Sequence, residues 1–141
     1  EQFNGRIDAF VAGVGTGGTL MGVSQALKEI NSNVKIVAVE PYESAVMEGK
    51  LPSQHNIQGI GEGFIPPLIS MDEIDEVIAI KTQDAIEMMS RLTKEEGLMV
   101  GISSGANVLA SLKLAEKMGS GKNIITILPD RGERYLSMDF Y

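Results

Sequence analysis

Val11-Ala-Gly-Val-Gly-Thr-Gly-Gly-Thr-Leu20 joins a short apolar run to a helical pattern through a turn that is rich in glycine. Glycine has no Cβ, so such a turn can adopt positive φ angles and bring several backbone N–H groups close to one anion. The helix that follows would add its own free N–H groups and the positive end of its dipole. The stretch therefore predicts a phosphate-binding turn between a strand and a helix.

Three interpretations of this turn stay open on its residues alone. The spacing Gly13-x-Gly15-x-x-Gly18 matches the dinucleotide fingerprint, and Glu40 stands about where a ribose-binding acid would, so an NAD-binding domain is one interpretation. Gly15-Thr-Gly-Gly-Thr19 instead looks like the phosphate loop of pyridoxal-phosphate enzymes of the tryptophan-synthase-β type. A tight strand-to-helix turn without a ligand is the third interpretation.

Length and composition favour one globular domain. The chain has 141 residues, of which 43% are hydrophobic and 22% are charged, which is an ordinary balance for such a domain. No apolar run approaches the roughly 18 residues that span a bilayer, so we expect no membrane association. A net charge of −7 argues against nucleic acid as a partner. The absence of cysteine excludes disulfides and thiolate chemistry and is compatible with the cytoplasm, where we expect the protein.

Apolar runs and helical spacings alternate along the chain and predict an α/β fold. This alternation favours an open, mostly parallel twisted sheet with helices on both faces. Thr19 and Thr82 are placed to cap two of the helices. We expect strands at residues 7–12, 34–39, 74–80 and 123–128, and buried helical stripes at Leu20, Val23, Leu27 and Ile30, at Ala85, Met88, Met89 and Leu92, and at Val108, Leu109, Leu112 and Ala115.

Polar segments follow the predicted strands and suggest one ligand crevice. The glycine turn, Ser103-Ser-Gly-Ala106 and Pro129-Asp-Arg-Gly-Glu-Arg-Tyr135 are the candidates, because open α/β sheets bind ligands at the carboxyl ends of their strands. A second glycine loop, Gln58-Gly-Ile-Gly-Glu-Gly63, lies in a long irregular stretch and is expected to be functional. We interpret His55 as a solvated loop histidine, and Asp130, Arg131, Glu133 and Arg134 as a surface ion-pair cluster rather than a catalytic group.

Five motifs in order make the chain resemble the C-terminal part of cysteine synthase, also called O-acetylserine sulfhydrylase. The resemblance covers nearly the whole chain, so residues 1–141 are expected to form a single α/β domain that corresponds to the cofactor-phosphate-binding part of that enzyme. The motifs are Val11-Ala-Gly-Val-Gly-Thr-Gly-Gly-Thr-Leu20, Val37-Ala-Val-Glu-Pro41, Ile57-Gln-Gly-Ile-Gly-Glu-Gly-Phe-Ile-Pro66, Gly101-Ile-Ser-Ser-Gly-Ala106 and Pro129-Asp-Arg-Gly-Glu-Arg-Tyr-Leu-Ser137.

The resemblance implies a pyridoxal 5′-phosphate enzyme of fold type II that replaces the acetoxy group of O-acetyl-L-serine with sulfide. It implies that Ser103 forms a hydrogen bond with the pyridine nitrogen, although a helix cap is the simpler role for this serine. Gln58 and Gly59 would line the substrate side, and Glu40 would be a structural acid at a strand end. The residues that would hold the cofactor phosphate are Gly15, Thr16, Gly17, Gly18 and Thr19.

The resemblance also implies what the chain lacks. The Schiff-base lysine of the family belongs to the N-terminal half, which nothing here matches, and the lysines of this chain fall at positions typical of solvent-facing charge. We therefore assign no catalytic residue and no metal ligand, and we expect the chain not to turn over alone. The family implies a homodimer and the C-terminal tail of serine acetyltransferase as a partner. Cystathionine β-synthase and phosphoserine-using enzymes share these motifs, and Glu62 stands where relatives often carry a small residue.

Overall fold

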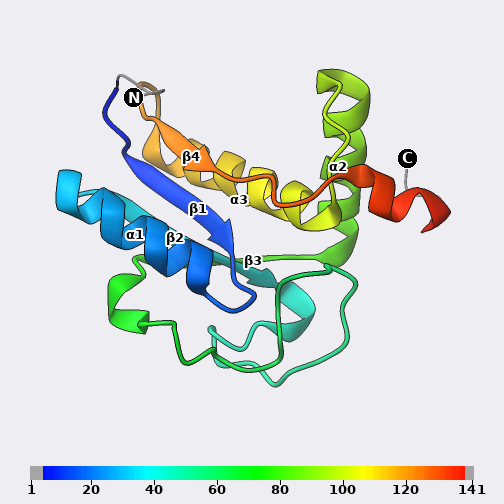
Figure 1. Cartoon of the computed structure of the whole chain (residues 1–141), viewed down its shortest axis with the longest axis horizontal. Helices are drawn as coiled ribbons and strands as arrows, with labels where there is room; N and C mark the ends of the chain where they lie inside the picture. Colours follow the sequence, from blue (N-terminus) through cyan, green and yellow to red (C-terminus); the bar gives the residue numbers. More distant parts are fainter. Residues whose placement is uncertain (1–4, 139–141) are drawn as a thin grey trace.

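A parallel four-stranded sheet with helices on both faces forms the framework of the molecule (Figure 1). The computed structural model describes residues 5–138. The strand order is β3-β2-β1-β4, and every pair of neighbouring strands is parallel. The elements are β1 (Ala9–Gly13), α1 (Gly18–Ile30), β2 (Lys35–Pro41), η1 (Tyr42–Ser44), η2 (Met71–Glu73), β3 (Glu76–Ile80), α2 (Thr82–Glu96), α3 (Ile102–Met118), β4 (Ile124–Thr126) and η3 (Gly132–Met138).

Alternate residues of the central strands pack into two separate hydrophobic cores. Ala9 and Val11 of β1 face the core that α2 and α3 complete, whereas Phe10 and Ala12 face the core that includes Leu20 of α1. This alternation follows from the period of two along a strand. Figure 1 shows α1 on one face of the sheet and α3 with α2 on the other. The predicted fold class is confirmed.

The two helices on one face approach each other at a glycine. A Cβ built on Gly105 of α3 would lie 2.1 Å from the carbonyl oxygen of Ala85 in α2, so only hydrogen fits at this position. The close contact presses the first turns of α3 between α2 and the sheet. Those turns are almost completely buried, from Ile102 to Asn107.

The predicted helix caps are wrong, and two residues of the predicted buried stripes, Ile30 of α1 and Leu112 of α3, are exposed, whereas Val108 and Leu109 of α3 pack against the core as predicted. Gly17, with φ of 87°, precedes α1, and Lys81 precedes α2. The hydroxyl of Thr82 instead accepts a hydrogen bond from the backbone N–H of Asn56 at 3.3 Å. Leu112 of the expected α3 stripe is 48% exposed, because small residues such as Ala106 and Ala110 carry the contact with the sheet.

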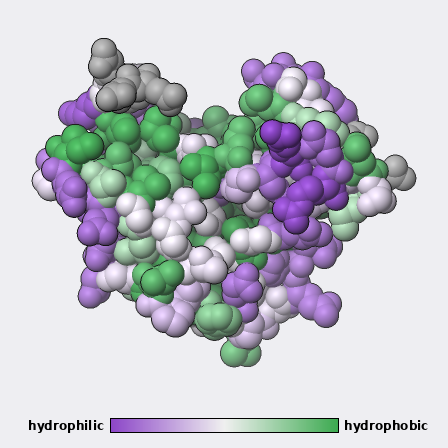
Figure 2. Space-filling view, viewed as in Figure 1, coloured by the Kyte–Doolittle hydropathy of each residue, from purple (hydrophilic) through white to green (hydrophobic). Residues whose placement is uncertain are grey.

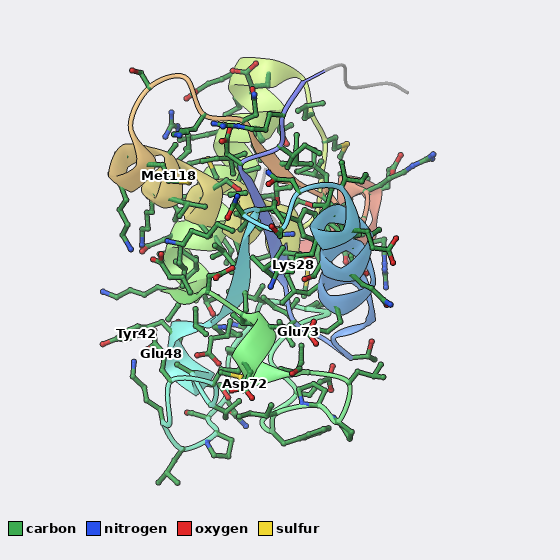
Figure 3. The ribbon with its side chains drawn as sticks, turned by 90° about the vertical axis from the view of Figure 1, so that its left-hand side faces the viewer. Lys28, Tyr42, Glu48, Asp72, Glu73 and Met118 are labelled. Atoms are coloured by element: carbon green, nitrogen blue, oxygen red, sulfur yellow. The ribbon has the colours of Figure 1, made fainter. Side chains whose placement is uncertain are left out.

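The stretch between β2 and β3 holds only the short helices η1 and η2, as its prolines and glycines predicted. It is fastened to the rest of the fold by side chains. Lys28 of α1 donates a hydrogen bond to the carbonyl oxygen of Glu73 at 3.0 Å, and the two residues lie close together in Figure 3. The carboxylate of Glu43 accepts a hydrogen bond from the backbone N–H of Thr82 in α2 at 2.9 Å. This irregular stretch is therefore held in a defined course.

Candidate functional site

A cavity of about 370 Å³ opens where β1 ends, and its size is typical of a small-molecule site. Four segments that are distant in sequence line it, and they include every candidate that the sequence analysis assigned to a ligand by resemblance. The predicted crevice is thus present as a cavity. Its lining residues are Gly13, Gly15, Thr16, Gly17, Gly18, Thr19, Gln58, Gly59, Ile60, Glu62, Ser103, Asn107, Ile127, Pro129, Asp130, Arg134 and Tyr135.

The first glycine loop packs so closely on neighbouring segments that side chains at two of its glycines would collide with them. A Cβ on Gly15 would lie 2.5 Å from the carbonyl oxygen of Gly59, and one on Gly17 would lie 2.7 Å from Cδ1 of Ile69. Gly17 also has a positive φ, which disfavours any L side chain. The loop therefore presents backbone and the two threonine hydroxyls at the start of α1. Backbone N–H groups at a helix N-terminus form a favourable site for an anion.

The second glycine loop packs against the chain at the end of β1. The N–H of Gly61 donates to the carbonyl oxygen of Val14 at 2.9 Å, and Nε2 of His55 lies 2.8 Å from the carbonyl oxygen of Gly61. His55 is half-buried, so the prediction of a solvated histidine is wrong. Gly59, Gly61 and Gly63 all have positive φ. This backbone course brings Gln58 and Gly59 to the cavity.

Helix α3 supplies the polar side chains on the opposite wall. Ser103 is 4% exposed and is the second residue of α3, which follows Gly101, so it lines the cavity from inside the helix and is not its N-cap. Asn107, one turn further, is 1% exposed, and its Nδ2 donates to the carbonyl oxygen of Ile127 at 3.0 Å. Its Oδ1 is buried without a hydrogen-bond partner in the described part of the chain. The sequence analysis missed Asn107, although its spacing of four from Ser103 puts both on one helix face.

The turn after β4 closes the remaining side. Asp130 was expected in a surface cluster, but its carboxylate is mostly buried and accepts a hydrogen bond from the Tyr135 hydroxyl at 2.5 Å. Arg131 and Glu133 are exposed, as predicted. Figure 2 shows hydrophilic side chains gathered near the place where η3 begins. Asp130 differs from its neighbours because it packs inward on Gly101.

Glu40 belongs to the core rather than to the cavity. It is 1% exposed, and its carboxylate accepts hydrogen bonds from the backbone N–H groups of Met47 at 2.9 Å and Glu48 at 3.1 Å. Burial raises the pKa of Glu40, and the two N–H groups partly oppose this effect. A carboxylate enclosed in this way does not reach a ribose, so the dinucleotide interpretation lacks its acid. The role of a structural acid, implied by the resemblance, agrees with these contacts.

Comparison with known proteins decides between the remaining interpretations. The family model described as "Pyridoxal-phosphate dependent enzyme" matches residues 1–130. The chain belongs to the pyridoxal-phosphate dependent enzymes. Within residues 5–138 of this family member, no group of three or more histidines and acidic residues could hold a metal ion. No helix in the same range has the length and apolar character needed to cross a bilayer.

Similar members of this pyridoxal-phosphate dependent family include proteins named cysteine synthase. One from Staphylococcus aureus (strain Mu50) is 49% identical over 142 residues, which is 100% of this chain and 46% of that protein. Cysteine synthase A of Escherichia coli K12 is also 49% identical, over 97% of this chain and 45% of its own length. The O-acetyl serine sulfhydrylase isoform 3 of Entamoeba histolytica has a TM-score of 0.95 and 52% identity over 98% of this chain and 42% of that structure. The chain spans less than half of these relatives.

The residues of the cavity fit pyridoxal phosphate, the cofactor of this family. The glycine loop at the start of α1 lines the cavity with backbone, and its close packing on Gly59 and Ile69 leaves no room for a Cβ at Gly15 or Gly17. The other wall offers the hydroxyl of Ser103 and the unpartnered oxygen of Asn107. The cavity thus has one end for an anion and another for a polar ring.

Proposed function

We propose that the chain is the cofactor-phosphate-binding part of a cysteine synthase, which forms L-cysteine and acetate from O-acetyl-L-serine and sulfide. One observation carries the proposal: the glycine loop, Ser103 and the Gln58–Gly59 segment line the same cavity, as the resemblance requires. Identity of 49% to proteins named cysteine synthase supports the same activity.

Each wall of the cavity has its own role in this proposal. Backbone N–H groups of residues 15–19 and the hydroxyls of Thr16 and Thr19 hold the phosphate. The Ser103 hydroxyl faces the pyridine nitrogen, and Gln58 and Gly59 border the substrate. When bound, pyridoxal phosphate supplies the electron sink for replacement at the β-carbon. A neutral hydroxyl partner leaves the ring nitrogen less protonated than a carboxylate partner would.

Covalent attachment of the cofactor is proposed to depend on a lysine outside residues 1–141. No lysine lies among the described residues that line the cavity. The chain alone therefore holds the cofactor without a covalent bond and does not form cysteine. The homodimer, the cytoplasmic location and the serine acetyltransferase tail as a partner belong to this proposal through the resemblance alone.

A thiol-bearing amino acid in place of sulfide is the second candidate, as in a cystathionine β-synthase. An O-acetylserine dependent cystathionine beta-synthase from Helicobacter pylori has a TM-score of 0.92 and 40% identity over 96% of this chain. A phosphoserine substrate is less favourable on electrostatic grounds. Glu62 and Asp130 line the cavity with Arg134 as the single cation among its described lining residues, so a second phosphate would meet net negative charge.

A titration of the purified chain with pyridoxal phosphate tests the proposal. We expect saturable binding that inorganic phosphate competes away. We also expect no lysine to be modified at stoichiometric level after borohydride treatment and mass spectrometry. Replacing Thr16 and Thr19 together with alanine should weaken binding about tenfold, since two hydroxyl donors are lost.

The matched control is Gly22→Ala in α1, where an added Cβ meets no atom within 4 Å. This variant should bind the cofactor as the parent chain does. Binding that phosphate does not displace would contradict the phosphate cradle. One defined lysine trapped by borohydride would contradict the assignment of the covalent anchor to another segment, and cysteine formation by the chain alone would do the same.

A further inference from the structure

Asp130 contacts Gly101, the residue that precedes α3. Its carbonyl oxygen accepts a hydrogen bond from the N–H of Gly101 at 3.1 Å. Its carboxylate packs so tightly on the same residue that a Cβ on Gly101 would lie 2.0 Å from Oδ1. The backbone and the side chain of Asp130 therefore both hold Gly101 in place.

Tyr135 fixes the orientation of that carboxylate. Its hydroxyl donates to Oδ2 of Asp130 at 2.5 Å, and its ring is 1% exposed within the core on the α3 side of the sheet. The guanidinium group of Arg134 lies 4.0 Å from the same oxygen but is largely exposed, so it contributes less. Oδ1 of Asp130 is buried without a hydrogen-bond partner in residues 5–138. The positive end of the α3 dipole beside it favours a negative charge there.

The position of Gly101 determines the position of the first turn of α3. The carbonyl oxygen of Gly101 accepts hydrogen bonds from the N–H groups of Ser104 at 3.1 Å and Gly105 at 3.3 Å. Ser103 lies inside this turn, between the Asp130 contact at Gly101 and the α2 contact at Gly105. Displacement of Gly101 would consequently displace the Ser103 hydroxyl within the cavity.

We propose that Asp130, oriented by Tyr135, is a positioning residue that sets the Ser103 hydroxyl against the ring of the bound cofactor. This inference rests on the proposed function and assigns to the turn after β4 a role on the ring side of the cavity. The phosphate end belongs to a different segment, the loop before α1. Loss of the Asp130–Tyr135 contact therefore affects ring binding and leaves phosphate binding intact.

Two probes separate the ring side from the phosphate side, namely inorganic phosphate and pyridoxal phosphate. In Tyr135→Phe, which removes one hydroxyl, we expect the affinity for pyridoxal phosphate to fall about tenfold and the affinity for phosphate to change less than about twofold. Asp130→Ala also removes a negative charge from the cavity lining, so its expected effect is a lower affinity for pyridoxal phosphate relative to that for inorganic phosphate. Asp130→Asn should restore part of the loss, because its amide oxygen still accepts from Tyr135. The control Glu133→Gln, at an exposed position of η3, should leave both affinities unchanged.

A double-variant cycle tests whether the effect passes through Ser103. In a Ser103→Ala background, Tyr135→Phe should cause no further loss of pyridoxal phosphate affinity. Additive losses, or equal losses for phosphate and pyridoxal phosphate, would identify a merely structural role and overturn the proposal.

Hydrogen exchange of the chain without ligand gives an independent measurement. Tyr135→Phe should speed exchange of the amides of Ser104 and Gly105, which donate to the Gly101 carbonyl oxygen, at least about tenfold relative to α1 amides. Unchanged exchange at these amides would overturn the inference whatever the cofactor does. Failure of the parent chain to bind pyridoxal phosphate, with faster exchange in the variant, would instead contradict the proposed function and the ring-side role that rests on it.

Discussion

The α-carbon of Gly15 lies so close to the carbonyl oxygen of Gly59 that a Cβ at residue 15 would come within 2.5 Å of it. The obstacle is backbone, so it cannot rotate aside as a flexible side chain would. The phosphate loop and the Gln58–Gly63 loop therefore fix each other's position. Any change that separates them alters both the anion end and the substrate end of the cavity.

Gly15→Ala is expected to lower the affinity for inorganic phosphate at least about tenfold and to destabilise the fold by about 1–3 kcal/mol, because the two loops must separate. Phosphate titration followed by NMR and denaturant unfolding measure the two effects. Gly22→Ala is the control, and it should gain up to about 1 kcal/mol from the higher helix propensity of alanine. Equal phosphate affinity in Gly15→Ala and the parent chain would show that the loops do not depend on this contact.

Gly105→Ala should destabilise the fold by about 3 kcal/mol or more, since the new methyl group meets the Ala85 carbonyl at 2.1 Å and α2 and α3 must move apart. Urea unfolding gives the free energy of unfolding. Gly121→Ala is the comparison, because its φ of 76° causes strain of about 1–2 kcal/mol but no atom obstructs the Cβ. A smaller loss at residue 105 than at residue 121 would contradict the close helix contact.

Glu76→Gln should lower stability at neutral pH by about 1 kcal/mol. Lys117 and Lys35 both bond the Glu76 carboxylate, the latter at 2.7 Å, and together they lower its pKa below the usual 4.5. A carboxylate with a lowered folded pKa contributes stability above its unfolded pKa, and this contribution disappears as the pH falls through the folded pKa. The difference between parent and variant should accordingly shrink below about pH 4.5.

Thermal unfolding of both proteins across this pH range measures the effect. The exposed pair Arg91–Glu95 on α2 offers the control variant Glu95→Gln, which should change stability less. A Glu76→Gln difference that stayed constant from neutral to acidic pH would exclude this ion network as its source.

Glu40→Ala should cost about 1–3 kcal/mol, because the N–H groups of Met47 and Glu48 lose their acceptor. Burial raises the pKa of Glu40, so its ionisation contributes the opposite pH dependence to that of Glu76: stability falls as the pH rises from the unfolded to the folded pKa. Denaturant unfolding at several pH values checks both statements.

NAD should not raise the melting temperature of the parent chain, because Glu40 is buried and does not reach a ribose. Saturable NAD binding that is abolished in Glu40→Ala would restore the dinucleotide interpretation.

The sheet and its helices were predictable where burial leaves a pattern in the sequence. Residues 34–39 and 7–12 are apolar runs because strands of a parallel sheet are covered on both faces. The stripe on α2 was correct because Met88, Met89 and Leu92 are large and regularly spaced. On α3 the predicted stripe was correct for Val108 and Leu109, which pack against the core, but it included the exposed Leu112. It missed Gly105, Ala106 and Ala110, because small residues add little hydrophobicity to a sequence pattern.

The cavity was predictable as a meeting of strand ends, but some of its side chains were not. The glycine loop and Ser103 carry local signals, a turn and a resemblance. Asp130 sits among charged neighbours, so local composition predicted exposure, whereas its burial depends on the absence of a side chain at Gly101. Asn107 has an unpartnered oxygen, which only tertiary structure reveals.

The cavity is assembled from both the first strand and the turn that follows the last one, with Gly13 and Tyr135 among its lining residues. During synthesis on a ribosome, the phosphate loop emerges well before η3. The wall of the cavity that follows β4 is incomplete until β4 has paired with β1. All of the described lining residues are therefore present only once synthesis has passed Tyr135. A cavity that is closed on every side thereby reports that β4 has joined the sheet.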